Sequence, residues 1–104
     1  MPTNGDCTII RKDDDDNYFI VATYPCMWQE TEAYEVKKYE EENAYKAAVW
    51  IPDISADVKK RDYIIRGKLE YISEFDPDTA LTVMSTGRRD YGSPDMWHVQ
   101  IGAR

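Results

Sequence analysis

The sequence predicts a small all-β domain, an antiparallel β-barrel or sandwich of six to seven short strands with one long loop at about residues 32–43. Three observations support this prediction. Short runs of β-branched and aromatic residues recur along the 104 residues, and clusters of Pro, Gly and Asp separate them. The 8 Tyr and 3 Trp suit half-buried sheet surfaces and protein interfaces. Hydrophobic residues make up 42% of the chain, a composition typical of a globular domain.

The N-terminal part of the chain is typical of a β-hairpin. Residues 7–11 (CTIIR) and 18–24 (YFIVATY) are strand-forming runs, and the polar segment 12–17 (KDDDDN) between them predicts a turn. Pro25 has no backbone N–H, so we expect it to interrupt the ladder of hydrogen bonds. A third short strand is then expected over residues 26–30 (CMWQE), after a bend at the proline.

The segment 32–43 (EAYEVKKYEEEN) fits two structures. Ala33, Val36 and Tyr39 would share one face of a helix, and the Glu and Lys residues around them favour helix formation. The segment has no convincing cap residue or stop signal, however. We therefore expect an extended, mobile loop and leave the helix as the alternative.

The C-terminal half contains the remaining predicted strands. Pro52, an Asp-Pro turn at 76–79 (DPDT) and a loop at 87–94 (GRRDYGSP) separate them, and Gly67 is expected at a strand end or bulge. The predicted strands are residues 45–51, 62–67, 71–75, 81–86 and 96–101. The side chains expected to anchor the core are Trp50, Ile64, Val83, Trp97 and Val99.

The chain is predicted to form a single domain over residues 1–104, because it contains no internal repeat and no low-complexity linker. Residues 1–6 are expected to be a flexible tail. They lack the basic and apolar regions of a signal peptide, and no apolar run is long enough to span a bilayer. We therefore expect synthesis in a cytoplasm and no membrane association.

The net charge of -7 argues against partners that are themselves strongly negative. A protein that binds nucleic acid or an anionic membrane needs a basic face, and 20 acidic residues against 13 basic ones argue against both. Two interpretations of the acidity remain. It serves solubility, or it provides a surface that repels or imitates DNA.

The residues that commonly carry catalysis are few. Cys7 and Cys26 lie 19 positions apart without a CxxC pair, and His98 is the single histidine. A disulfide between neighbouring strands is geometrically possible, but we expect both cysteines to be small core residues. No nucleophile–base pair or metal-ligand set is evident, so we expect no enzyme, no catalytic residue, no metal and no cofactor.

Two charged clusters are candidates for interaction. The four consecutive carboxylates at 13–16 do not have the alternating spacing of a calcium loop, which favours a solvated turn or a negative interface tip. Arg88 and Arg89 can clamp a phosphate or a partner carboxylate, or form a local ion pair. The residues expected at an interface or facing a channel are Asp13, Asp14, Asp15, Asp16, Tyr34, Tyr39, Glu40, Glu41, Glu42, Arg88 and Arg89.

The order of three segments carries a resemblance to a known family. Residues 47–52 (AAVWIP), 62–67 (DYIIRG) and 81–102 (LTVMSTGRRDYGSPDMWHVQIG) follow one another, with an acidic-Pro turn between the last two. This order resembles small structural proteins encoded in the head–tail modules of tailed phages and prophages of Gram-positive bacteria. The chain departs from that family at Arg61-Asp62, where Gly-Asp is usual, and at Trp97-His98, where His-Trp is typical.

The resemblance implies a virion protein of the head–tail connector, similar to the head–tail stopper or head-completion proteins. Such a subunit would assemble as a ring with copies of itself and contact portal, adaptor or tail proteins. DNA would pass through the ring without sequence-specific binding. The alternatives are an acidic phage inhibitor that mimics DNA, or another minor capsid or tail component. The acids are bunched at 13–16 and 40–42, which weakens the mimicry alternative.

Overall fold

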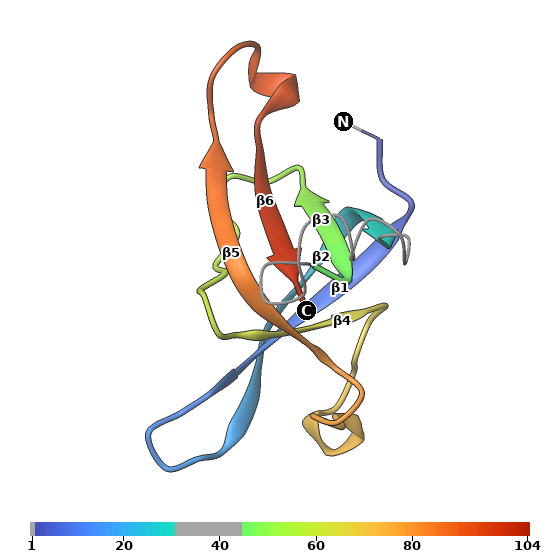
Figure 1. Ribbon diagram of the computed structural model, residues 1–104, viewed down its shortest axis with the longest axis vertical. Coiled ribbons are helices and arrows are strands. Elements are labelled where there is room, and N and C mark those ends of the chain that lie inside the picture. Colours follow the sequence, from blue (N-terminus) through green and yellow to red (C-terminus); the bar gives the residue numbers. More distant parts are fainter. Residues whose placement is uncertain (1, 31–44) are drawn as a thin grey trace.

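The computed structural model describes residues 2–30 and 45–104, in which six strands form a closed antiparallel barrel (Figure 1). The order of neighbours around the barrel is β1-β2-β3-β6-β5-β4. This confirms the all-β prediction and selects the barrel over the sandwich. The strands are β1 Gly5–Lys12, β2 Tyr18–Glu30, β3 Ala47–Ile51, β4 Tyr63–Arg66, β5 Leu81–Arg89 and β6 His98–Ala103.

Two long strands close the barrel because each pairs with different neighbours along its length. The first part of β2 pairs with β1 and its last four residues pair with β3, while β5 begins against β4 and continues against β6. The register shifts between Ile9 and Ile10 in one pair and between Val83 and Ser85 in the other. Such irregularities increase local twist and bend a sheet, as closure requires.

The prediction that Pro25 interrupts the ladder is wrong, because β2 runs without a break from Tyr18 to Glu30. Pro25 lies opposite Asp6 of β1, and the Asp6 carbonyl accepts a hydrogen bond from the Gly67 amide on its other side, at 2.7 Å. Residues in an antiparallel pair alternate between positions that exchange hydrogen bonds and positions that do not. Pro25 occupies a position of the second kind, where β1 requires no N–H from it.

The first strand begins within residues 1–6, which the sequence predicts to be a flexible tail. Gly5 and Asp6 belong to β1. The Asn4 side chain donates to the Trp28 carbonyl at 2.9 Å and accepts from the Trp28 amide at 2.8 Å, so it extends the pairing beyond the strand. This side chain therefore takes the place of a backbone partner for β2.

The core lies inside the barrel and includes three of the five predicted anchors. Ile64, Val83 and Val99 are buried, as predicted. Trp50 and Trp97 are only half-buried, so their assignment to the core is wrong. Trp50 alternates with Val49 and Ile51, which point inward, and Trp97 precedes β6. The buried apolar residues also include Cys7, Ile9, Ile10, Cys26, Trp28, Ala47, Ile101 and Ala103.

The connection between β4 and β5 differs from the prediction. Residues 71–75 do not form a strand, because Ile72–Glu74 is a single 3₁₀ turn, η2. Phe75 follows it and packs in an aromatic cluster with Tyr18 and Tyr63, at centroid distances of 5.1 Å and 5.5 Å. The predicted turn at 76–79 is present, closed by the Thr79 amide on the Asp76 carbonyl at 3.2 Å. The cluster therefore fixes this connection against the base of the β1–β2 hairpin.

One ion pair with a buried carboxylate links β1 to the segment before β4. Asp62 is 4% exposed and accepts two hydrogen bonds from Arg11, from Nε and Nη2, both at 2.9 Å. It accepts a third from the Lys59 amide at 2.8 Å. Arg11 also donates to the exposed Asp57, and these bonds to Asp62 and Asp57 raise the pKa of Arg11. Charge-assisted and bidentate bonds of this kind are the strong ones in proteins.

Arg61 has an unfavourable backbone conformation, with φ at 80°. A side chain in this left-handed region costs about 1–2 kcal/mol. We expect Arg61→Gly to raise the free energy of unfolding by about 0.5–1 kcal/mol, because glycine adopts this conformation freely but loses more backbone entropy on folding. Urea unfolding of the variant tests this. Lys60→Gly, at an exposed neighbour outside the left-handed region, is the control and should destabilise; equal effects from both variants would contradict the argument.

Candidate interaction site

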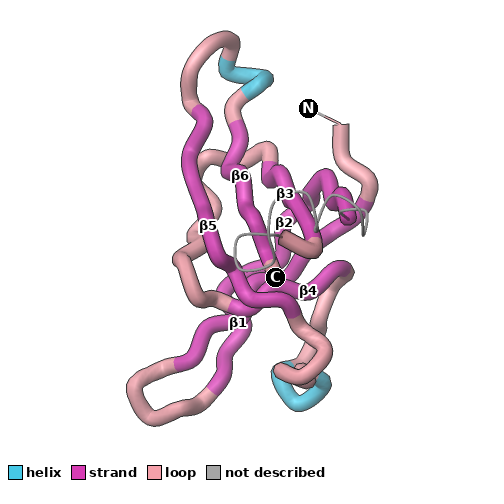
Figure 2. Tube along the Cα trace, viewed as in Figure 1, coloured by secondary structure: helices cyan, strands magenta, loops and turns pink. Residues whose placement is uncertain are grey.

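Two hairpins project from opposite ends of the barrel. The turn between β1 and β2 extends at the bottom of the view, and the turn between β5 and β6 extends at the top (Figure 2). Both groups of charged residues that the sequence singles out in the described chain belong to these hairpins. The structure therefore separates residues 13–16 from Arg88 and Arg89 rather than bringing them together.

The tip of the β1–β2 hairpin is an acidic turn held by hydrogen bonds to Asp13. One carboxylate oxygen of Asp13 accepts hydrogen bonds from the Asp15 and Asn17 amides, both at 2.9 Å, and the Asp13 amide donates to the Asn17 carbonyl at 2.8 Å. All four aspartates at 13–16 are exposed. Asp13 thus shapes the turn, as Asp often does, while Asp14 and Asp15 lie free at its surface. Among the described residues, no group of His, Cys, Asp and Glu is placed to hold a metal ion.

Arg88 and Arg89 lie in the last two positions of β5, so the prediction that they belong to a loop is wrong. The strand continues because they pair with Val99 and His98 of β6. Both side chains are exposed, and Arg88 is 3.7 Å from the Asp90 carboxylate, a surface pair of small energetic value. The guanidinium of Arg89 lies back along the strand, over Gly87.

The tip of the β5–β6 hairpin exposes large apolar side chains. Tyr91 is 75% exposed and Met96 is 57% exposed. The loop that carries them is held by internal bonds, because the Trp97 indole donates to the Gly92 carbonyl at 3.2 Å and the Met96 amide donates to the Ser93 carbonyl at 2.9 Å. We call Tyr91, Met96 and Trp97, together with Arg88, the hairpin patch.

Tyr91 and Met96 are candidate interface residues that are not predicted from the sequence. A signal for them was present, because a Tyr and a Met interrupt a loop of turn-forming residues. The short 3₁₀ turn Pro94–Met96, η3, places Met96 outward, and no periodic pattern indicates that direction. The other predicted interface residues, Tyr34, Tyr39, Glu40, Glu41 and Glu42, lie outside the described residues, as does the predicted loop over 32–43.

The two cysteines lie in the core of the barrel, as predicted for small apolar residues. Cys7 and Cys26 are both free thiols and completely buried. A hydrogen bond to Cys26 and burial raise the pKa of Cys7 well above its ordinary value, so this thiol stays protonated near neutral pH. His98 lies at the start of β6, where a ring nitrogen is 3.0 Å from the Met96 carbonyl.

Comparison with known proteins gives a family and no function. A family described as "Family of unknown function (DUF6751)" matches residues 2–104. No curated protein and no solved structure matches the chain. Within residues 2–30 and 45–104, no helix is long and apolar enough to cross a membrane.

Proposed function

The chain belongs to DUF6751, a family of unknown function, and we propose that its member here is a structural subunit of a phage head–tail connector that assembles through its hairpins. The subunit is similar in role to a head–tail stopper or head-completion protein. It joins copies of itself in a ring around the DNA channel, contacts portal, adaptor or tail proteins, and performs no catalysis. The hairpin patch is the observation that carries this proposal.

The composition of the hairpin patch is typical of protein interfaces. Tyr, Trp, Met and Arg are the residues enriched where proteins meet, and Tyr, Trp and Arg dominate binding hot spots. Exposed side chains such as Tyr91 and Met96 lose contact with water when a partner covers them, which favours association. The internal bonds hold the Trp97 ring and the loop backbone in place, which reduces the conformational entropy that this part of the patch loses when it binds.

The two hairpins present different surfaces at opposite ends of the molecule. The β1–β2 tip presents exposed carboxylates, while the β5–β6 hairpin presents Arg88 and Arg89 beside Asp90 and Asp95, two basic and two acidic residues. A contact between two different surfaces of identical subunits closes a ring when the rotation between neighbours closes. Both hairpins extend beyond the closed part of the barrel, so their side chains are available for contacts between copies.

The overall acidity supports a role beside DNA that moves. A ring with inward carboxylates repels phosphates and allows a duplex to pass without sticking. The net charge of -7 provides this repulsion. The place in the phage particle comes from the resemblance of residues 47–102 to head–tail module proteins.

We expect the double variant Tyr91→Ala/Met96→Ala to weaken self-association by about tenfold or more, because hot-spot side chains each contribute more than 1 kcal/mol. Light scattering of the purified protein over a range of concentrations measures the effect. Tyr71→Ala is the matched control, since Tyr71 is 66% exposed but directly precedes η2, in the connection between β4 and β5 rather than in the β5–β6 hairpin. If the two variants self-associate with the same affinity, the hairpin patch is not part of the interface.

The place in the particle needs a separate measurement. Mass spectrometry of purified virions from the phage or induced prophage that encodes the chain should detect it at the copy number of a ring. Its absence from mature particles, with the major capsid protein clearly detected, would overturn the proposed function.

A further inference from the structure

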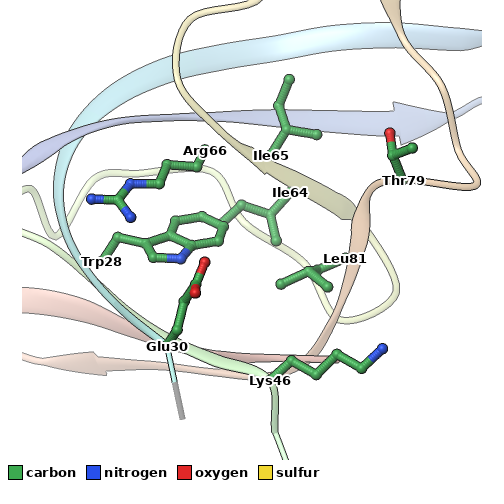
Figure 3. Close-up of a pocket in the computed structure, with 8 residues that line it drawn as sticks. All are labelled: Trp28, Glu30, Lys46, Ile64, Ile65, Arg66, Thr79 and Leu81. Atoms are coloured by element: carbon green, nitrogen blue, oxygen red, sulfur yellow. The ribbon is translucent and has the colours of Figure 1, made fainter. Parts of the chain in front are cut away.

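A cavity opens at the end of the barrel where four strand ends meet. Its volume is about 640 Å³, within the range of sites that hold small ligands or one or two side chains. Glu30 ends β2, Lys46 precedes β3, Arg66 ends β4 and Leu81 begins β5, and all four line the cavity. Figure 3 shows these side chains around one hollow. The hairpin patch does not contribute to it.

The wall of the cavity includes a buried polar atom without a partner. Trp28 is 6% exposed, and its indole Nε1 is the one buried side-chain nitrogen or oxygen among the described residues that forms no hydrogen bond. An indole N–H only donates, so it requires an acceptor. An unsatisfied buried donor costs about 1–3 kcal/mol, which a bound acceptor would recover. Ile64 and Leu81 continue this wall as an apolar surface.

The rim of the cavity places an acceptor next to that donor. Figure 3 shows the nitrogen edge of the Trp28 indole turned toward the Glu30 carboxylate, and no hydrogen bond joins them. A donor and an acceptor on one wall match one residue of an extended chain, whose backbone N–H and C=O point to the same side. A carboxylate at the indole would instead be repelled by Glu30. The polar part of the site therefore fits the backbone of an extended peptide.

Two cations complete the rim. Lys46 and Arg66 are exposed and line the cavity, and neither forms an ion pair with a described residue. With Glu30 they leave the site one positive charge, in a chain whose net charge is -7. The local sign is thus opposite to that of the whole protein, which favours an acidic partner at this end of the barrel.

We propose that this cavity binds a peptide segment of a partner protein that carries an aliphatic residue followed by an acidic one. The aliphatic side chain packs on Leu81 beside Trp28. The backbone C=O of the aliphatic residue accepts from the Trp28 indole and its N–H donates to Glu30, and the acidic side chain pairs with Arg66 and Lys46. The site is separate from the hairpin patch and does not depend on ring formation.

The test uses capped peptides and the indole N–H signals of the full-length protein. The probe is acetyl-Gly-Leu-Asp-Gly-amide, titrated while ¹H–¹⁵N spectra are recorded, with the three tryptophan signals assigned from single Trp→Phe variants. We expect a saturable shift of the Trp28 signal while the Trp50 and Trp97 signals stay in place. No shift of the Trp28 signal up to millimolar peptide would overturn the proposal.

Two comparisons separate the contacts. Arg66→Gln/Lys46→Gln should weaken binding by about fivefold, the value of two exposed ion pairs, and the peptide with Lys in place of Asp should bind as weakly to the wild type. Both substituted residues are exposed, so the fold is retained. If the double variant binds the Asp peptide as tightly as the wild type does, Arg66 and Lys46 do not bind the acidic side chain.

4-Methylpentanoate has the aliphatic group and the carboxylate but no amide, so it should bind more weakly than the peptide. Equal affinity for the two ligands would assign the site to aliphatic acids instead.

Discussion

Asp62→Asn is expected to lower the free energy of unfolding by about 3 kcal/mol or more. The substitution keeps the shape of the side chain but removes the charge that Arg11 binds through two hydrogen bonds of 2.9 Å. Arg11 is itself only 19% exposed, so water replaces the lost partner poorly. Neutralising the buried carboxylate leaves the Arg11 charge with only the exposed Asp57 as an anionic partner, and this is more costly than removing Arg11 and Asp62 together.

Urea unfolding, followed by circular dichroism, measures this change. Asp57→Asn is the matched control, because Asp57 binds the same guanidinium from the solvent side. Arg11 holds the pKa of the Asp57 carboxyl below its usual range, yet water screens that exposed pair. We expect the unfolding midpoint of Asp57→Asn to stay close to that of the wild type. A larger decrease in the free energy of unfolding for Asp57→Asn than for Asp62→Asn would show that burial does not determine the strength of these ion pairs.

Ile9→Ala is expected to lower the free energy of unfolding by about 2–5 kcal/mol. Ile9 is completely buried and belongs to the core cluster inside the barrel. Its neighbours cannot move far into the space left behind, because β1 pairs on both sides, with β2 and with β4. The cost therefore includes both the lost burial of the side chain and the cavity that remains.

The same unfolding experiment on Trp50→Ala provides the comparison. That substitution removes a larger side chain, but Trp50 lies on the outer face and is half-buried. We expect it to cost less than Ile9→Ala. The reverse order would mean that Trp50 anchors the fold, as the sequence alone suggested.

The sequence predicted the strands well because each one has its own local signal. Short β-branched runs mark β1 and β4, alternating residues mark β5, and Gly67, with φ at 100°, follows the end of β4 as expected. Pro25 misled the prediction because its effect depends on which side of β2 faces β1. That side follows from the register of the two strands, which local sequence does not reveal.

The sequence did not predict correctly which tryptophans are buried. Trp28 is buried while Trp50 and Trp97 are not, although all three lie in or beside strands. A large aromatic residue suits either face of a sheet, so residue type alone does not decide. The face becomes clear only when neighbours such as Val49 and Ile51 are used to fix the alternation.

The candidate site was predictable only in part, for a similar reason. The acidic tip is one continuous run, and the sequence places it on a turn correctly. The cavity beside Trp28 combines the ends of four strands that are distant in the chain, so no local motif indicates it. The outward direction of Met96 depends on a single 3₁₀ turn, which leaves no periodic signal.

The order of strands around the barrel has a kinetic consequence. β1 must pair with β4 across the intervening strands, and β3 must pair with β6, which follows the other described strands in the sequence. Folding rates fall as contacts become more distant in sequence, and barrels of this kind fold in milliseconds to seconds. Until β6 docks, β3 and β5 each expose an unpaired edge that can recruit strands from other chains. Yield on refolding should therefore depend steeply on protein concentration.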